Sequence, residues 1–235
     1  MRKSPYIILI AILGGLTIVS SVAGRQDGET ITIEEILDGI KESAMSFNRS
    51  LQNLTVKQTI TCKATFIGEA KVVKEIRFRR PDIIEQRIME REEKVRNGSN
   101  IKIERPVTYT LFMKSPLSSL SLDDCDVDLI GKKTVRGRPT YLLWVKPKDE
   151  RGDFINGKIW IDAKDFTLVR LESKPIKKED RSKVKNAKQI IEYDKIGDKY
   201  WLPILDRIEG SGWIFVKIVS EVMYSHYEIN SGGDE

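Results

Sequence analysis

The sequence predicts an exported, mainly antiparallel β protein with a few α-helices. Three observations support this class. The first residues have the composition of a secretion signal, and one amphipathic helical pattern follows them. The rest of the chain alternates short runs of apolar and polar residues with turn-forming glycine, asparagine and aspartate. Strands that follow one another through such short connections pair antiparallel.

The N-terminus has the pattern of a signal peptide. Basic residues precede an apolar stretch over residues 7–23, which ends in Ser21-Val22-Ala23. Small side chains at these positions fit a signal-peptidase site, so we expect residues 1–23 to be removed by cleavage after Ala23. An uncleaved anchor is the alternative, although the stretch is short for a membrane span. Residues 24–235 would then form a single extracytoplasmic domain, in the periplasm or at the cell exterior.

The charge pattern argues against a nucleic-acid partner. The chain has 40 lysines and arginines against 35 aspartates and glutamates, and the two signs are interleaved. Such a pattern is typical of a solvated surface and not of a basic binding groove. No other apolar run approaches membrane length, so we do not expect the mature chain to span a membrane.

A helix is predicted over residues 33–51. Thr32 and Glu35 have the spacing of a capping box at its start. The apolar residues that recur at helical spacing are Ile33, Ile36, Leu37, Ile40, Ala44, Phe47 and Leu51. A helix with one apolar face must pack on something, and the remaining chain offers mostly strands.

Strands are predicted along most of the remaining chain. The first covers 55–67, and a second, 71–79, ends at the turn Arg80-Pro81-Asp82. The stretch 83–96 fits both a helix and a strand, and its periodicity alone does not decide between them. The further predicted strands are 100–105, 107–113, 126–135, 139–147, 154–162, 166–173, 187–195, 199–208 and 212–229, with a short helical segment near 115–122.

The sequence contains no motif that predicts catalysis. It lacks a nucleophile elbow, a paired-histidine metal motif, a phosphate loop and a dinucleotide fingerprint. His226 is the one histidine and lies in a strand-like tail. The aspartates around Cys125 lack the glycine and terminal glutamate of a calcium loop, so we interpret them as an acidic turn. We therefore expect neither an enzyme nor a metal or cofactor site.

The two cysteines, Cys62 and Cys125, lack the spacing of a redox or zinc motif. In an oxidising compartment they could pair, and we predict a disulfide between them. Two free thiols are the alternative.

Several strands carry large apolar side chains on both faces, as in 140–146, 158–162 and 212–219. One helix cannot cover so wide a sheet. Part of the apolar surface must therefore pack on itself as an ordinary core or hold a ligand, and the pattern leaves both open.

The order of motifs in residues 131–175, GKKTVRGRPTYLLWVKPKDERGDFINGKIWIDAKDFTLVRLESKP, resembles the outer-membrane lipoprotein carrier (LolA-like) superfamily, the lipoprotein-sorting proteins. This superfamily includes the large domain of the periplasmic sigma-E regulators. Shorter segments also resemble it: Arg80-Pro81-Asp82, Val95-Arg96-Asn97-Gly98, Lys199-Tyr200-Trp201-Leu202-Pro203 and Tyr224-Ser225-His226-Tyr227.

The resemblance implies a curved, unclosed antiparallel half-barrel with helices on its concave side. It also implies that 83–96 is a strand, and that the cavity holds acyl chains or hydrophobic client segments. Two features depart from the family. The internal arginine that latches the lid helices of the carriers has no aligned counterpart here, and no residues remain for the second domain of the sigma-E regulators.

Strand parity predicts which side chains would line such a cavity: Phe66, Phe78, Leu143, Ile159, Ile161, Val169 and Leu171. The expected function is that of a secreted binding protein, a carrier or chaperone that holds a lipid, an acyl chain or a lipidated client. The alternative is an envelope sensor or protein-interaction module of the sigma-E regulator type, without catalytic activity, whose partner is an envelope protein.

Overall fold

The computed structural model describes residues 31–80, 83–96, 112, 117, 122–148, 156–174, 185–211 and 216–229. Thr32–Glu235 form one compact unit, to which all of the following elements belong. The predicted signal peptide over residues 1–23, with its cleavage site after Ala23, lies outside the described residues. So do most of the predicted segments 100–105, 107–113 and 115–122.

The predicted helix is confirmed as α1, Ile33–Ser50. Its capping box is also confirmed: the Glu35 backbone N–H donates to Thr32 Oγ1 at 3.2 Å, and the Thr32 backbone N–H donates to Glu35 Oε2 at 2.9 Å. The apolar face is buried through Ile36, Ile40, Ala44 and Phe47. No helix in the described part of the chain is long and apolar enough to cross a lipid bilayer.

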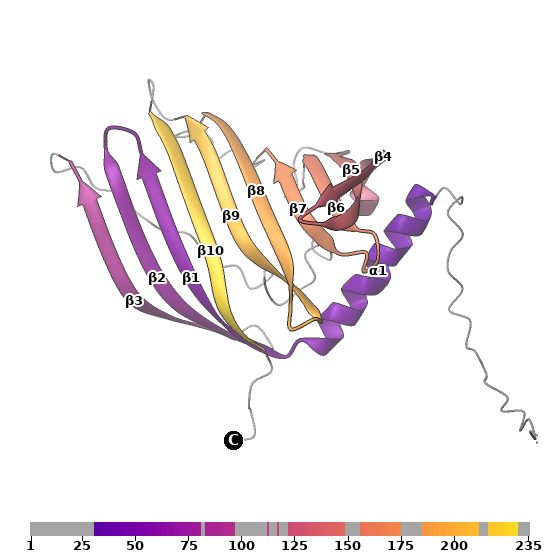
Figure 1. The fold of residues 1–235 in the computed structure, drawn as a ribbon, viewed down its shortest axis with the longest axis horizontal. Helices are drawn as coiled ribbons and strands as arrows, with labels where there is room; N and C mark the ends of the chain where they lie inside the picture. Colours follow the sequence, from indigo (N-terminus) through magenta and orange to yellow (C-terminus); the bar gives the residue numbers. More distant parts are fainter. Residues whose placement is uncertain are drawn as a thin grey trace, which may run out of the picture. The chain divides into compact units, whose positions relative to one another are not determined.

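The strands form one ten-stranded antiparallel sheet (Figure 1). They are β1 (Asn53–Ala64), β2 (Gly68–Arg79), β3 (Ile83–Val95), β4 (Cys125–Val135), β5 (Arg138–Pro147), β6 (Gly157–Asp162), β7 (Leu168–Ser173), β8 (Lys185–Ile196), β9 (Tyr200–Ser211) and β10 (Lys217–Ile229), with a short 3₁₀ helix, η1 (Leu122–Asp124), before β4.

The sheet is not closed. Its order is β3-β2-β1-β10-β9-β8-β7-β6-β5-β4, so the first and last strands, β1 and β10, pair in its interior. β3 and β4 form its two ends and do not pair with each other. The predicted fold class, a mainly antiparallel β half-barrel that stays open, is therefore confirmed.

The ambiguous stretch 83–96 is a strand, as the resemblance implied. β3 pairs with β2 from Ile83, opposite Arg79, to Val95, opposite Gly68. Nearly all of its side chains are exposed, because it lies at the end of the sheet. A strand that is exposed on both faces has no buried side, so its sequence need not alternate apolar and polar residues. This explains why the periodicity of 83–96 did not distinguish a strand from a helix.

The hairpin between β4 and β5 turns at Arg136 and Gly137, which both have positive φ, 51° and 79°. Two positive values in succession are typical of a type I′ turn, whose twist matches that of the paired strands.

A hydrophobic cluster joins α1 to the strands around the β1–β10 pair. Its buried residues are Phe47, Leu51, Leu54, Val56, Ile60, Ile76, Phe78, Phe112, Tyr200, Leu202, Val222 and Tyr224. Phe112 comes from the connection between β3 and β4. Its ring stacks on Phe78, with centroids 4.7 Å apart, and meets Tyr224 edge-on at 5.0 Å. We call the sheet face that carries this cluster the inner face.

The predicted disulfide is not formed in the structure, where Cys62 and Cys125 are not bonded to each other. Cys62 lies on β1 and Cys125 at the start of β4, with six strands between them in the sheet. The distance along the sequence did not reveal this separation. Burial, with a smaller contribution from the nearby Asp124 carboxylate, raises the pKa of the Cys125 thiol, so this thiol is a poor nucleophile.

Candidate functional site

Five of the seven predicted lining residues lie together on β5, β6 and β7. Leu143 pairs with Ile159, and Ile159 pairs with Leu171, so these three form one row across the strands. Ile161 and Val169 extend the same buried patch. All five side chains are at most 6% exposed, so they are buried to the same degree as residues in an ordinary protein core.

The structure does not bring the other two predicted residues into this patch. Phe78 lies on β2, in the hydrophobic cluster around Phe112. Phe66 is 75% exposed, in the turn between β1 and β2, where its φ of 70° is left-handed. Strand parity placed Phe66 with the inner residues of β1, but the strand ends at Ala64 and the side chain leaves the sheet there.

α1 packs on the sheet with contacts to the β6–β7 turn and to the β8–β9 hairpin. Gly39 lies against the ring of Phe166, so closely that a Cβ on residue 39 would stand 2.6 Å from Phe166 Cγ. The Phe166 ring in turn stacks on Tyr141 of β5 at 6.2 Å. Since Tyr141 pairs with Ile161, it lies on the same face as the buried patch.

At its C-terminal end α1 contacts the β8–β9 hairpin. The Phe47 ring meets Tyr200 edge-on, with centroids 6.1 Å apart. The Tyr200 hydroxyl donates to the backbone carbonyl oxygen of Ser50 at 3.2 Å. The Ser50 hydroxyl donates to the carbonyl oxygen of Phe47 at 3.2 Å.

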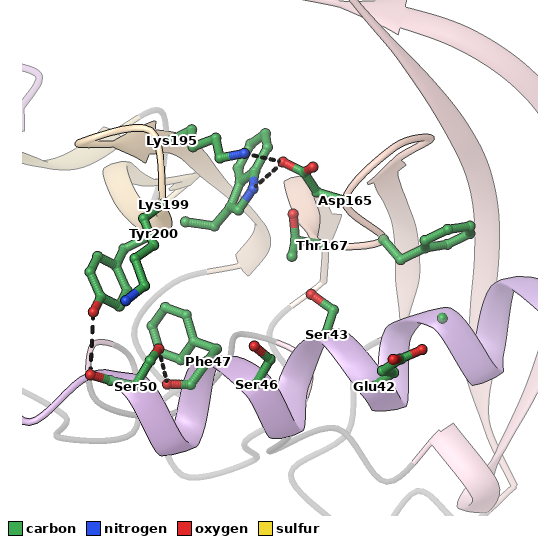
Figure 2. Close-up of a pocket in the computed structure, with 13 residues that line it drawn as sticks. Glu42, Ser43, Ser46, Phe47, Ser50, Asp165, Thr167, Lys195, Lys199 and Tyr200 are labelled. Carbon is green, nitrogen blue, oxygen red and sulfur yellow. Dashed lines mark hydrogen bonds and ion pairs between the residues drawn. The ribbon is translucent and has the colours of Figure 1, made fainter. Parts of the chain in front are cut away.

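Between α1, the β6–β7 turn and the β8–β9 hairpin lies a pocket of about 360 Å³ (Figure 2). We call it the seam pocket, because it follows the seam between α1 and the sheet. The helix contributes Gly39, Glu42, Ser43, Ser46, Phe47 and Ser50. The β6–β7 turn contributes Asp165, Phe166 and Thr167, and the β8–β9 hairpin contributes Lys195, Lys199, Tyr200 and Trp201.

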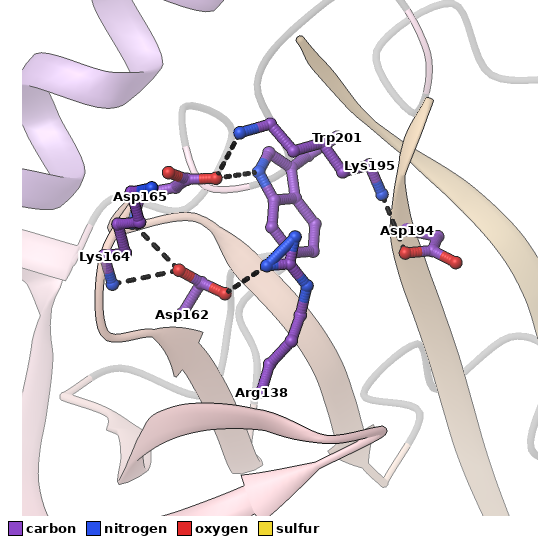
Figure 3. A network of polar contacts seen from close by, with 7 residues as sticks. All are labelled: Arg138, Asp162, Lys164, Asp165, Asp194, Lys195 and Trp201. Atoms are coloured by element: carbon purple, nitrogen blue, oxygen red, sulfur yellow. Dashed lines mark hydrogen bonds and ion pairs between the residues drawn. The ribbon is translucent and has the colours of Figure 1, made fainter. Parts of the chain in front are cut away.

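Asp165 joins the two sheet segments that line the seam pocket opposite α1, and we call this side of the pocket its roof (Figure 3). Asp165 Oδ2 accepts hydrogen bonds from Lys195 Nζ at 2.8 Å and from Trp201 Nε1 at 3.0 Å. Burial raises the pKa of the Asp165 carboxyl. The two hydrogen bonds, with the positive charges of Lys195 and Arg138, outweigh that effect and hold the pKa below its usual range. Asp165 is therefore a fixed carboxylate at neutral pH.

A second carboxylate, Asp162, shapes the turn that carries Asp165. Asp162 is 2% exposed, and its Oδ1 accepts from the backbone N–H groups of Lys164 and Asp165, both at 2.9 Å. Its Oδ2 lies 3.5 Å from Arg138 Nη1, and the Arg138 guanidinium stacks over the Trp201 ring at 4.8 Å. This network, seen in Figure 3, holds the β6–β7 turn and the Trp201 indole in place on the side of the pocket opposite α1.

Thr167 presents a hydroxyl that the fold leaves unused. It is 8% exposed, and its Oγ1 is buried with no hydrogen-bond partner among the described residues. Figure 2 shows Thr167 at the pocket, on the side opposite the serines of α1. A buried polar group without a partner costs about 1–3 kcal/mol, so such groups are uncommon and point to a missing partner.

The sequence did not predict the seam pocket. Its signal was the spacing of Ser43, Ser46 and Ser50, which recur on one side of α1 beside the apolar residues. Small polar residues next to an apolar face leave room and hydrogen-bonding capacity. The partners of this stripe, on the β6–β7 turn and the β8–β9 hairpin, lie more than 100 positions away along the chain.

The structure places His226, the one histidine of the sequence, on β10. His226 is exposed, and its Nδ1 lies 3.0 Å from Ser225 Oγ. Among the described residues, no group of three histidine, cysteine, aspartate or glutamate side chains is arranged to hold a metal ion.

No protein-family model matches the chain, and no curated protein matches it. Several solved structures are similar. An outer membrane lipoprotein-sorting protein domain from Vibrio parahaemolyticus has 13% identity and a TM-score of 0.43, and the match covers 86% of this chain and 93% of that one. A LolA superfamily protein from Nitrosomonas europaea has 15% identity and a TM-score of 0.42, covering 87% of this chain and 96% of that one.

A chain of the Pseudomonas aeruginosa MucA/MucB complex has 11% identity and a TM-score of 0.25, covering 83% of this chain and 95% of that one. These similarities name the superfamily that the sequence motifs resemble. All three TM-scores are below 0.5, so the proposals below rest on the geometry of this chain alone.

Proposed function

We propose that the protein is an extracytoplasmic binding protein that holds a lipid, an acyl chain or the lipidated part of a client against its inner face. One observation carries the proposal: the buried patch of Leu143, Ile159, Ile161, Val169 and Leu171 lies on the same face as Tyr141, whose ring stacks on Phe166 beside α1. α1 contacts the β6–β7 turn through Gly39 and the β8–β9 hairpin through Ser50, and the seam pocket lies between the helix and these two segments.

The driving force for such binding is the removal of methylene groups from water. Each buried methylene contributes about 0.8 kcal/mol, so about ten of them give roughly 8 kcal/mol. That free energy corresponds to a dissociation constant of about 1 μM. Because the patch residues are already covered, a bound chain must displace the groups that cover them, and the measured affinity would be reduced by that cost.

Uptake of a fluorescent fatty acid by the purified exported protein tests the proposal. We expect saturable binding that Leu171→Phe weakens, because the larger ring would occupy the place that a bound chain takes when it displaces the groups that cover the patch. Met223→Phe is the matched control, since Met223 is 55% exposed and lies outside the patch. Absence of saturable uptake by a folded wild-type protein would reject the proposal, and so would equal uptake by the two folded variants.

The extracytoplasmic location is part of the proposal and is supported by the signal-like first 23 residues. The intact mass of the exported chain checks it. A mass that starts at Gly24 is expected, whereas a chain that keeps its first residues would support the anchor.

A second candidate is a protein-interaction module, and the exposed end strand favours it. β3 pairs with β2 on one side, and no strand among the described residues pairs with its other side. A partner strand could add there, although the charged side chains along β3 are of the kind that discourage edge pairing. Crosslinking in the native envelope that joins β3 to a partner protein, with no fatty-acid uptake, would favour this function over the first.

A further inference from the structure

The seam pocket has a composition unlike that of the buried patch of Leu143, Ile159, Ile161, Val169 and Leu171. Ser43, Ser46 and Thr167 line it together with charged side chains. Its volume of about 360 Å³ is much larger than the roughly 30 Å³ that a water molecule occupies in the liquid. The pocket can therefore admit a polar group of several heavy atoms.

The charges around the seam pocket cancel. Glu42 and Asp165 are acidic, and Lys195 and Lys199 are basic. Lys195 is bound to Asp165, and Lys199 Nζ lies 4.9 Å from the centre of the Tyr200 ring. An anionic group would have to approach two carboxylates without a surplus of positive charge. A neutral group with hydroxyls can donate to the carboxylates and exchange hydrogen bonds with the serine and threonine hydroxyls.

The buried Thr167 hydroxyl is the independent sign of a ligand. Its Oγ1 finds no partner within the described residues, although the residue is more than nine-tenths buried. The next two residues, Leu168 and Val169, are each 1% exposed on β7, and Val169 belongs to the buried patch of β5–β7. A group bound at Thr167 thus adjoins the place where an acyl chain would begin.

We propose that the seam pocket binds a neutral, hydroxyl-rich headgroup, of the glycerol or sugar class, whose acyl chain lies on the patch of β5–β7. This inference rests on the proposed function and adds the ligand's polar end to it. Phe47 and Tyr200 offer ring faces or edges at the pocket wall, the usual partners of the apolar side of a sugar.

The experiment compares four probes with one chain length: monopalmitoylglycerol, palmitoyl glucoside, palmitic acid and hexadecyl phosphate. We expect one of the two neutral hydroxylated probes to bind at least about 10-fold more tightly than hexadecyl phosphate. Which of them binds more tightly distinguishes a glyceride from a glycolipid. Equal affinity for all four probes would overturn the inference while leaving the proposed function standing.

Thr167→Val removes the hydroxyl and keeps the shape of the side chain. We expect it to weaken the preferred neutral probe about 3- to 10-fold, the loss of one hydrogen bond, and to change palmitic acid binding less than 2-fold. The matched control is Thr134→Val, on an exposed position of β4, which should change neither probe. Unchanged binding of the neutral probe by Thr167→Val would overturn the inference.

Folding is not a confounding factor for this variant. The hydroxyl has no partner to lose among the described residues, so Thr167→Val should keep or raise the midpoint of denaturant unfolding. A lowered midpoint would show that Thr167 has a structural role, against the inference.

Failure of the proposed function has a different signature. If none of the four probes binds, methyl glucoside and glycerol at millimolar concentration are titrated while the spectrum of the protein is followed by NMR. Shifts at Thr167 and Ser43 that Thr167→Val abolishes would support the headgroup site without an acyl function. Absence of those shifts would reject both.

Discussion

Asp165 shows how a single carboxylate organises the roof of the seam pocket. Its Oδ2 receives both the Lys195 ammonium and the Trp201 indole N–H, while Arg138 stacks on that indole. The interaction joins the β6–β7 turn to the β8–β9 hairpin, two segments that α1 also contacts. Because the pKa of Asp165 is lowered in the folded protein, the charged carboxylate contributes to stability.

The sign of the pH dependence follows from that lowered pKa. An unfolded Asp165 titrates near its ordinary value of 3.8 and binds protons before the folded one does. The stabilisation is therefore complete above that pH and is lost as the pH falls below it. Asp165→Asn should lower the free energy of unfolding at pH 7 by about 1–2 kcal/mol and flatten its decline between pH 4 and pH 2.

Urea unfolding at a series of pH values measures this effect. Asp198→Asn, at an exposed position in the β8–β9 turn, is the control and should keep the wild-type profile. If Asp165→Asn and the wild type lost stability in parallel below pH 4, the carboxylate would not have the role assigned to it.

At the scale of elements, the packing of α1 against the β6–β7 turn depends on the pair formed by Gly39 and Phe166. Phe166 has a left-handed φ of 51°, which disfavours a residue with a side chain. The ring is nevertheless placed against a helical glycine, at a distance that leaves no room for a Cβ. The strained backbone and the glycine within a helix are thus explained by one contact.

Gly39→Ala tests this contact because two effects oppose each other. Alanine improves helix propensity by about 1 kcal/mol, whereas the clash of its Cβ with the Phe166 ring costs about 1–3 kcal/mol. We expect a net loss of about 1 kcal/mol in the free energy of unfolding. In the Phe166→Ala background the same change should be neutral or stabilising, since the ring is gone. Stabilisation by Gly39→Ala in the wild-type background would show that the ring does not press on the helix.

Local elements could be predicted from the sequence, whereas their long-range pairing could not. α1 has a capping box and a 3.6-residue period, and both signals lie within one stretch of chain. β3 carried no such signal, because its side chains are exposed on both faces. The seam pocket needs Ser50 beside Tyr200, 150 positions away, and no local pattern specifies that contact.

At the scale of the whole sheet, the pairing of β1 with β10 determines which strands are neighbours and which are ends. The sequence predicted a meander of consecutive strands, and most neighbours in the sheet are indeed consecutive. The β1–β10 pairing moves the β4 end away from β1, so that six strands separate Cys62 from Cys125. The predicted disulfide was wrong for this reason.

Thiol titration of the denatured, unreduced protein checks the strand order through these cysteines. Two free thiols per chain are expected, since a disulfide requires Cα atoms within about 7 Å. A count of zero free thiols in a monomer would mean that β1 and β4 lie side by side, against the observed order.

The central claim is that the inner face holds an acyl chain, and native mass spectrometry of the exported protein tests it most directly. The account predicts a bound species whose added mass matches a lipid or acyl-bearing molecule, with fragments that identify the chain. It also predicts that Leu171→Phe reduces the bound fraction and that Met223→Phe does not. A folded protein that carries no lipid after purification, and takes none up from mixed acyl lipids, would contradict the claim.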